Sequence, residues 1–397
     1  MNIGITLGIQ KEYESMWVNG IKLNAILLVN ALNQISGVNT YILDTSNKIE
    51  DLTKVMWDYT KFPVKRYQDA YKDTDLLITL GTSLPVVMLD EFRKTGKNKK
   101  VVKYQCGNSY VIDMERSIFP KDGQEGVKAP WDGGADQVWY VPQQGYQNHD
   151  YYKVVYGIEE VYPVPFVWDP MFLDRTVEAY KRKGKAIPKY IPGKSNKDKK
   201  LNVFEPNMNV VKYSMIPILM AEEAYRRGIE YDQLFVSSGN RILKNAYFKS
   251  AIGSLSGVLA KPKPKFQFTS RYPITHYLAN SADIVLSHQW ENPLNYAYLD
   301  VMYFNYPLVH NADMIKDAGY YYPDFEILKG VEQLKFAIEE HDDNLDVYKE
   351  RNEKVLDRYT IKNKEMVQTY KKLLDNLFGY ETHKMSYEYD WKTNLYK

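Results

Sequence analysis

Residues 282–311 read ADIVLSHQWENPLNYAYLDVMYFNYPLVHN and contain the clearest structural signals of the chain. Residues 283–287 form a short, nearly all-apolar run, which predicts a buried parallel strand. Asn292 and Pro293 then predict the start of a helix, because asparagine caps helices and proline favours their first position. A second strand is predicted at residues 306–309, so this stretch is one strand–helix–strand unit of an open α/β sheet.

An acidic pair surrounds the predicted helix start. Glu291 precedes the helix and Asp300 lies inside it. Ligands bind outside the carboxyl ends of parallel strands, and helix N-termini bind anions. The pair therefore predicts a site for a phosphorylated, hydroxyl-rich ligand, in which carboxylates accept hydrogen bonds from hydroxyls. The alternative is a buried acid that only satisfies a neighbouring loop. His288, Gln289 and Trp290 crowd the same strand end and favour the ligand site.

Length and composition exclude several classes of protein. At 397 residues the chain is too long for one ordinary core, so two domains are expected. A net charge of +2 excludes a global basic field that would draw the chain to nucleic acid or an anionic membrane, while a local basic groove stays open. No apolar run approaches about 18 residues, so no transmembrane helix is expected. The single cysteine, Cys106, excludes an internal disulfide, and we expect a cytoplasmic protein, in the host cytoplasm if a phage encodes it.

The first half of the chain alternates predicted strands with predicted helices. Strands are expected at residues 2–7, 40–43, 75–80, 100–105 and 137–141, and helices at 20–35 and 85–94. This alternation predicts a doubly wound parallel sheet. No G-x-G-x-x-G follows the first strand, which disfavours a nicotinamide dehydrogenase. The proline-rich residues 159–170, EEVYPVPFVWDP, are expected to cross between domains.

A second alternating series begins at Leu201. Strands are predicted at residues 201–205, 233–237 and 266–269, and a helix at about 210–227 with Lys212 in its first turn. A lysine near a helix N-terminus is unfavourable for the helix dipole unless an anion binds there. Lys212 is therefore a phosphate candidate, and a solvated lysine is the alternative.

These patterns predict two Rossmann-like, doubly wound domains that face a cleft. We expect a first domain at residues 1–165 and a second domain at residues 166–360. Residues 361–397 are expected to form a C-terminal helix that packs back on the N-terminal domain, followed by a tail. Clefts at domain interfaces are the usual sites of small ligands.

The order of residues in the second domain resembles that of GT-B glycosyltransferases. That family carries a glutamate, a small turn, a helix with a second acid, then Gly-x-Pro and a strand. Here Glu291, residues 292–294, Asp300 and residues 305–307 occupy those places. In detail the chain is most similar to an uncharacterised phage and bacterial family that carries ENPLNYAYLD, EPNMNVVK and VPFVWDP.

A weaker likeness exists to the α-glucosyltransferases with which phages modify hydroxymethylated DNA bases. Their fourth strand is also followed by Tyr-Gln, as in Tyr104 and Gln105. Cys106, Gly107 and Asn108 stand where that family has a histidine and an aspartate.

The resemblance implies a hexosyltransferase that moves a sugar from a nucleotide sugar, favourably a UDP-sugar, to an acceptor. The acceptor would be a hydroxymethylated pyrimidine in phage DNA, or a glycan. Because no Asp-x-Asp stands at the carboxyl end of a predicted strand, basic residues and the helix dipole would replace a metal, and no tightly bound cofactor is expected. Retention of configuration is the weakly preferred outcome.

The resemblance also implies roles for individual residues. Glu291 would hold the transferred sugar, Asp300 the ribose, and the backbone of Leu294 and Asn295 the diphosphate. The implied catalytic candidates are Glu291, His288 and Asn108. The implied donor-binding candidates are Asn207, Asn209, Lys212, Asn240, Arg271, Asn292, Leu294, Asn295 and Asp300. The implied acceptor-binding candidates are Trp17, Gln105, Asp113 and Glu115.

Three other functions stay open on the sequence alone. They are a glycosyltransferase that acts on glycans or proteins, a nucleotide-sugar epimerase, and a non-catalytic protein that binds sugar or nucleic acid on the same fold. The sequence does not fix the sugar, the catalytic base or the oligomeric state.

Overall fold

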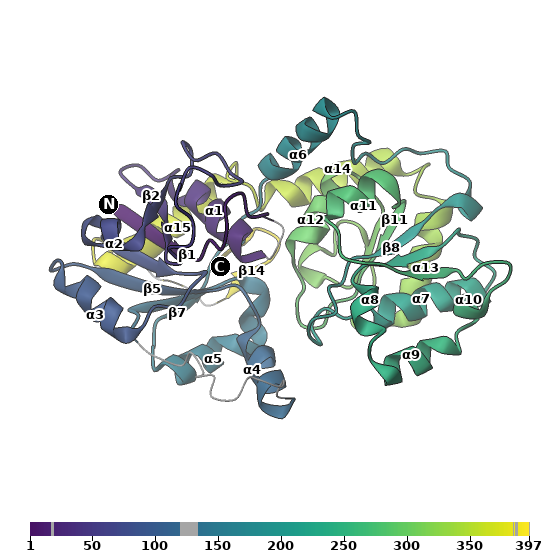
Figure 1. Cartoon of the computed structure of the whole chain (residues 1–397), viewed down its shortest axis with the longest axis horizontal. Helices are drawn as coiled ribbons and strands as arrows, with labels where there is room; N and C mark the ends of the chain where they lie inside the picture. The colour runs from purple at the N-terminus through teal and green to yellow at the C-terminus, as the bar shows by residue number, and fades with distance from the viewer. Residues whose placement is uncertain (17–19, 120–133, 384, 386–387, 397) are drawn as a thin grey trace. The chain divides into compact units, whose positions relative to one another are not determined.

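A computed structural model describes residues 1–16, 20–119, 134–383, 385 and 388–396. The chain forms two compact units (Figure 1). The first combines Met1–Asp169 with Arg358–Lys397, and the second is Pro170–Asp357. In the described part of the chain, no helix is long and apolar enough to cross a membrane.

The first unit is built on a seven-stranded parallel sheet with the order β3-β2-β1-β4-β5-β6-β7. Its strands are β1 (Asn2–Leu7), β2 (Asn39–Asp44), β3 (Val64–Arg66), β4 (Leu76–Thr79), β5 (Lys100–Gln105), β6 (Gln137–Tyr140) and β7 (Val161–Pro163). Its α-helices are α1 (Gly20–Leu32), α2 (Tyr67–Ala70), α3 (Val86–Lys94), α4 (Ser109–Ile118), α5 (Gly145–Tyr156) and α15 (Lys364–Phe378). The central strand β1 pairs with β2 and β4, and its apolar side chains, such as Ile3 and Ile5, are fully buried.

The proline-rich segment corrects one expectation. Residues 161–163 form β7, the edge strand beside β6, where only an interdomain crossing was predicted. An edge strand tolerates proline because only one side of its backbone joins the ladder. Val161 pairs with Val138 and is fully buried. Packing against the sheet therefore stabilises this strand, although the prolines in its sequence disfavour a strand.

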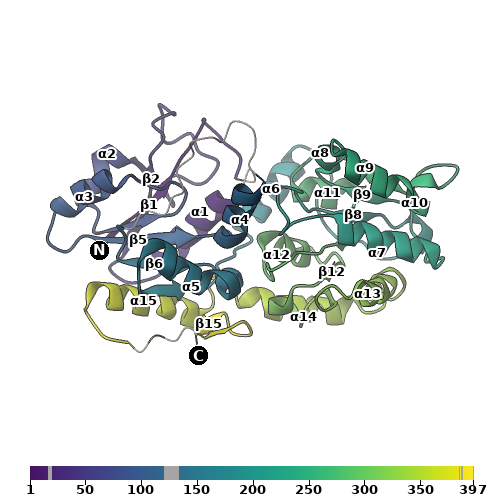
Figure 2. The same cartoon turned by 90° about the horizontal axis from the view of Figure 1, so that it is seen from below.

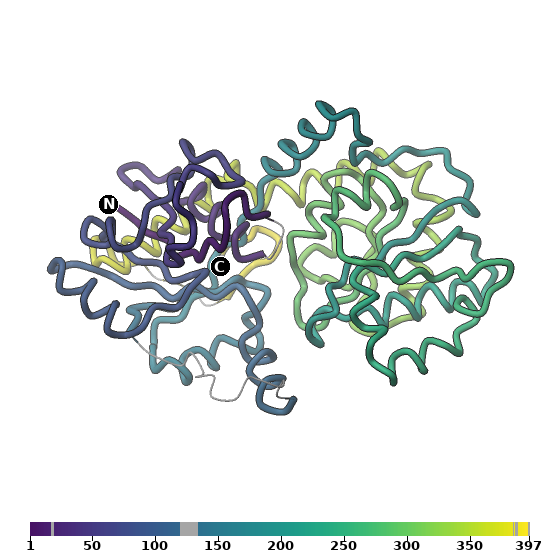
Figure 3. Tube along the Cα trace, viewed as in Figure 1, coloured from purple at the N-terminus to yellow at the C-terminus, as the bar shows by residue number. Residues whose placement is uncertain are grey.

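The end of the chain belongs to the first unit, and the trace shows the yellow segment returning to the purple and blue part (Figure 3). Helix α15 packs against α1 of the same unit. The Tyr370 hydroxyl donates to the Pro165 carbonyl at 2.7 Å. Asn394, in the turn between β14 (Tyr389–Asp390) and β15 (Leu395–Tyr396), exchanges two hydrogen bonds with the Phe166 backbone at 2.8 and 2.9 Å.

The second unit is a six-stranded parallel sheet with the order β10-β9-β8-β11-β12-β13, and helices cover both of its faces (Figures 1 and 2). Its strands are β8 (Leu201–Val203), β9 (Leu234–Val236), β10 (Phe266–Phe268), β11 (Ile284–Leu286), β12 (Leu308–His310) and β13 (Tyr320–Tyr321). Its α-helices are α6 (Met171–Arg182), α7 (Met215–Arg226), α8 (Gly239–Ile242), α9 (Ala246–Gly253), α10 (Ser256–Leu259), α11 (Ile274–Asn280), α12 (Tyr296–Tyr303), α13 (Ile327–Glu339) and α14 (Leu345–Asp357). The prediction of two doubly wound parallel sheets is confirmed.

The strands β8 and β11 lie at the centre of this second sheet and pair in parallel, with Val203 opposite Leu286. Both residues are fully buried, in one core with Ile218 of α7 and Leu334 of α13. Because the two strands are neighbours and run in the same direction, the loops that follow them leave from the same edge of the sheet. That edge holds most of the predicted donor-binding residues.

Candidate functional site

The loop after β8 is held by Asn207, which has a left-handed backbone (φ 53°). Its side-chain oxygen accepts hydrogen bonds from the Ser214 N–H at 2.9 Å and the Ser214 hydroxyl at 2.6 Å. Its amide nitrogen donates to the Glu205 carbonyl at 3.1 Å. The loop therefore continues to Ser214, and α7 begins at Met215 instead of residue 210. The predicted place of Lys212 in the first helical turn is wrong, because Lys212 lies in this loop.

The loop after β11 corrects the predicted helix start as well. Helix α12 begins at Tyr296, and its N-cap is Asn295, whose side chain accepts from the Tyr298 N–H at 3.2 Å. Asn292 is buried and donates to the side-chain oxygen of Gln289, so it does not cap a helix at Pro293. The Trp290 N–H donates to the Val211 carbonyl at 3.0 Å and joins this loop to the one after β8.

Glu205 is the centre of a hydrogen-bond network that the sequence did not reveal. It follows β8 directly and is only 2% exposed. The Ser287 hydroxyl hydrogen-bonds one of its carboxylate oxygens, and the Gln289 side-chain amide donates to the other at 2.9 Å. Ser287 also lies 2.8 Å from the Tyr298 hydroxyl. The sequence offered two signals for Glu205, namely its acidic side chain and its position after a predicted strand. Its partners Ser287 and Gln289 are 82 and 84 residues away along the chain, so the sequence did not show that they meet.

The hydroxyl of Ser287 has one hydrogen, so it donates to one partner at a time. When Glu205 is ionised it only accepts, and Ser287 must then donate to Glu205 and accept from Tyr298. When Glu205 is protonated, it is able to donate to Ser287, whose hydrogen turns toward Tyr298. Rotation of hydroxyl hydrogens thus accommodates both protonation states of the carboxyl group.

Burial controls the charge of this network. It raises the pKa of Glu205 from 4.5 to about 7, against the opposing effects of Ser287, Lys212 and Gln289. Burial also lowers the pKa of Lys212, and the Glu205 charge opposes that change. Lys212 forms no ion pair with any residue that the structure describes. Burial and the nearby Glu205 raise the pKa of Tyr298, so this phenol stays protonated.

His288 lies just after β11, next to Ser287, and its side chain is neutral. Its Nδ1 lies 3.0 Å from the Tyr322 hydroxyl, and its ring packs on Phe325 with 4.6 Å between centroids. Burial lowers the pKa of His288 to about 4. Its Nε2 is buried and has no hydrogen-bond partner among the described residues. The imidazole therefore offers one unused nitrogen, without a positive charge at neutral pH.

The predicted acidic pair flanks the start of α12. Glu291 is half-buried and has a left-handed backbone (φ 50°), which is strained for a residue other than glycine. Asp300 lies on α12 and is buried, with 5% of its surface exposed. Leu294 is fully buried, so only its backbone is able to face a ligand. The roles assigned to these residues stay predictions.

Other donor candidates follow the neighbouring strands of the same sheet. Asn209 lies in the loop after β8, and its buried side-chain oxygen accepts no hydrogen bond from a described residue. Asn240 lies in α8 and donates to the Ser270 hydroxyl at 3.1 Å. Arg271, which follows β10, is exposed, and its charge acts on Lys212 by lowering that lysine's pKa.

The acceptor candidates lie in the first unit. Asn108, also a catalytic candidate, is the N-cap of α4 and accepts from the Val111 N–H at 3.2 Å and the Asn148 amide at 3.0 Å. Gln105 donates to the Tyr156 hydroxyl at 3.1 Å, and Asp113 accepts from the Tyr151 hydroxyl at 2.7 Å. Glu115 also lies on α4, and Trp17 is outside the described residues. Asn108 has a structural role that the sequence did not predict.

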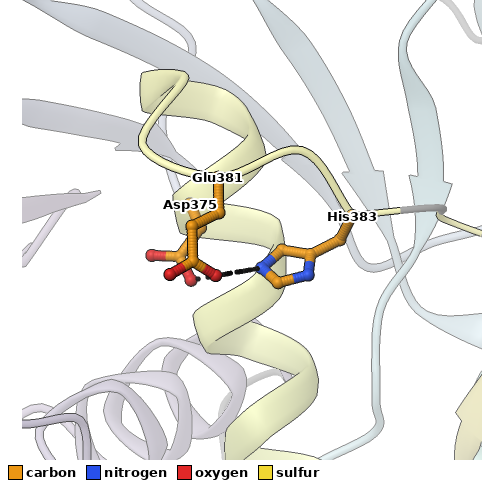
Figure 4. A group of neighbouring side chains, drawn as sticks. All are labelled: Asp375, Glu381 and His383. Carbon is orange, nitrogen blue, oxygen red and sulfur yellow. Dashed lines mark ion pairs between the residues drawn. The ribbon is translucent and has the colours of Figure 1, made fainter.

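One group of possible metal ligands exists among the described residues. It is distant in sequence from the loops after β8 and β11. Asp375, near the end of α15, converges with Glu381 and His383, which follow that helix (Figure 4). His383 Nε2 lies 3.2 Å from the Glu381 carboxylate and 3.5 Å from that of Asp375. The Lys371 ammonium pairs with Asp375 at 2.6 Å. Ion pairing within the protein therefore accounts for this group, and we assign no metal to it.

Solved structures share this fold with the chain at low sequence identity, and three of them illustrate the likeness. An α-glucosyltransferase in complex with UDP and a 13-mer DNA containing an HMU base has a TM-score of 0.55 and 15% identity, over 95% of this chain and 99% of that chain. Anabaena HepE in complex with UDP-glucose has a TM-score of 0.55 and 11% identity, with coverages of 95% and 100%. A UDP-forming trehalose-phosphate synthase from Burkholderia xenovorans has a TM-score of 0.56 and 12% identity, with coverages of 95% and 99%. The predicted GT-B fold class is confirmed.

The chain belongs to the family described as "Protein of unknown function (DUF2827)", whose family model matches residues 3–374. No curated protein sequence matches the chain. At identities of 11% to 15% the solved structures establish the fold alone.

Proposed function

We propose that this protein is a glycosyltransferase that takes a sugar from a nucleotide sugar, favourably a UDP-sugar. The observation that carries the proposal is the set of polar groups at one edge of the second sheet. Glu205 and Lys212 follow β8, and Gln289 and Glu291 follow the adjacent β11. Open α/β sheets bind their ligands at this edge. Of the three structures above, one is a complex with UDP, one is a complex with UDP-glucose and one is a UDP-forming enzyme, which supports the choice of nucleotide.

Backbone strain at the same edge supports the proposal. Asn207 after β8, Ser238 after β9 and Glu291 after β11 all have φ between 50° and 57°. Such conformations cost of order 1–3 kcal/mol for most residues and cluster at ligand sites, because folding alone does not require them. The presence of one such residue after each of three adjacent strands favours a binding role for this edge.

In the proposed donor complex, the second unit binds the nucleotide sugar. Lys212 and Arg271 neutralise the diphosphate, together with the first turn of α12, which begins at Tyr296. Asp300 accepts from the ribose hydroxyls and Glu291 from hydroxyls of the transferred sugar. His288 presents its unused Nε2 to the sugar or the leaving group. This arrangement requires no divalent metal and no bound cofactor.

Asparagine side chains complete the proposed donor site. Asn209 offers its unpaired oxygen, while Asn207, Asn292 and Asn295 hold the loops around the ligand. Asn240 contributes from the neighbouring loop after β9. These amides accept and donate hydrogen bonds without adding charge, as hydroxyl-rich ligands require.

The first unit is the proposed acceptor domain, with the boundary to the donor domain near residue 165. Gln105, Asn108, Asp113 and Glu115 follow β5 or lie on α4, and Trp17 is a further candidate. A hydroxymethylated pyrimidine in DNA is the favoured acceptor, because one matched α-glucosyltransferase is bound to DNA that contains an HMU base. A phage protein with this function would act in the host cytoplasm.

Thermal stabilisation by nucleotides tests the donor proposal. A ligand that binds only the folded state raises the melting temperature, so UDP or GDP at millimolar concentration should give a shift. The absence of a shift with every nucleoside diphosphate would reject the proposed function. Release of UDP in the presence of hydroxymethylated DNA, but not of glycans, would identify the acceptor. Epimerised donor without transfer would instead identify an epimerase.

A further inference from the structure

Glu205 and Lys212 form an isolated pair of opposite charges. The carboxylate of Glu205 receives its hydrogen bonds from Ser287, Gln289 and the His288 backbone N–H, all neutral groups. Lys212 is the cation whose charge lowers the pKa of Glu205, against the effect of burial. The other titratable groups that face it are the phenols of Tyr298 on α12 and Tyr322 after β13. Both phenols are neutral, since burial raises their pKa values well above 10.

The ammonium group of Lys212 is stabilised by the charge of Glu205 without forming a direct ion pair with it. No carboxylate of a described residue lies within 4.0 Å of its ammonium group, although the field of Glu205 stabilises its charge. Its other charged neighbour, Arg271, repels it. An anion is therefore attracted to these two basic residues, and the same anion repels Glu205.

We infer that Glu205 is a positioning residue, which balances the charge of Lys212 in the free protein and takes up a proton when a nucleoside diphosphate binds Lys212. The inference rests on the proposed function. A phosphate at Lys212 removes the effective counter-charge of Glu205, and a buried carboxylate without a counter-charge costs several kcal/mol. One proton from solvent converts the carboxylate to the neutral acid, and no covalent bond to carbon is formed or broken.

The hydrogen-bond network allows this change without moving heavy atoms. Ser287 and Tyr298 reverse the direction of their hydroxyl hydrogens, and Gln289 keeps its bond to the carbonyl oxygen of the acid. In the free protein the pKa of Glu205 is about 7, so a modest added negative potential suffices to protonate it. The affinity for the diphosphate should accordingly weaken as the pH rises above about 7.

Calorimetry with UDP tests the inference. At about pH 7.5, the dependence of the binding enthalpy on the ionisation enthalpy of the buffer gives the number of protons taken up. Wild type should take up about 0.5 to 0.8 proton more than Glu205→Gln, whereas protons released by UDP itself cancel in the difference. Glu222→Gln is the matched control, because Glu222 is equally buried but pairs with Arg226 at 2.8 Å. It should match wild type.

Infrared spectroscopy of the wild-type protein provides a test that needs no variant. UDP binding should produce a new band of a protonated carboxyl group. Equal proton counts for wild type and Glu205→Gln, or no such band while UDP still binds, would overturn the inference and leave the proposed function standing. A folded wild-type protein that binds no UDP would overturn both.

Discussion

Replacing Glu205 with glutamine is expected to stabilise the second unit above pH 7. Glutamine has the shape of the protonated acid. Its amide oxygen is able to accept from the Gln289 amide, and its amide N–H₂ is able to donate to the Ser287 hydroxyl. It cannot ionise, so the folded protein no longer has to bury a carboxylate that is 2% exposed. Removing this buried charge, which has no ion-pair partner among the described residues, should therefore raise the free energy of unfolding.

The size of the effect follows from the shifted pKa. The pKa of Glu205 rises from 4.5 to about 7 on folding. At about 1.4 kcal/mol per pKa unit, ionisation costs the folded state ~3 kcal/mol. The unfolded chain releases this proton first, so wild type loses stability as the pH rises from about 4.5 to about 7. Glu205→Gln should equal wild type near pH 4 and exceed it by ~3 kcal/mol near pH 8.

Urea unfolding, followed by pulsed hydrogen exchange in peptides that contain β8 and β11, measures the stability of this unit. The control Glu222→Gln should change stability in the opposite direction at pH 8. Glu222 accepts from the Ser256 and Gly257 N–H groups at 2.7 and 2.8 Å, and weakening such charge-assisted bonds costs about 1.5–3 kcal/mol. If Glu205→Gln is less stable than wild type at pH 8, or has the same pH dependence, the reasoning about Glu205 is wrong.

Three further substitutions test other parts of the account. Asn295→Ala removes the N-cap of α12 and should lower the free energy of unfolding by about 1 kcal/mol; an unchanged urea midpoint would argue against the cap. Lys22→Met breaks the buried ion pair with Glu14, 2.5 Å long, and should destabilise the first unit by about 3–5 kcal/mol at neutral pH, again in urea. Glu291→Gln should abolish sugar transfer while the melting temperature stays near that of wild type, and a fully active variant would remove Glu291 from the site.

The sequence predicted the alternation of strands and helices well because that pattern is local. The short strands β3 and β7 were missed, since three-residue strands give no clear periodicity and β7 ends in a proline. The start of α12 was wrong by three residues. Asn292 and Pro293 satisfy the local rule for a helix start, but a buried hydrogen bond from Asn292 to Gln289 prevails over it.

The candidate site was predicted in part. Lys212 was identified as a phosphate candidate, but from a helical position that it does not occupy. Glu205 was not identified, because its importance depends on burial and on Ser287 and Gln289, which reach it only through the pairing of β8 with β11. Such a network depends on contacts between distant segments, which a single sequence does not reveal.

Hydrogen exchange with and without UDP shows whether the ligand lies at the ends of β8 and β11. We predict that UDP protects residues 204–214 and 287–297, which are the loops after β8 and β11 and the start of α12, and that Lys212→Met loses this protection. Binding of UDP that protects only other segments, or that is unaffected by Lys212→Met, would contradict the account.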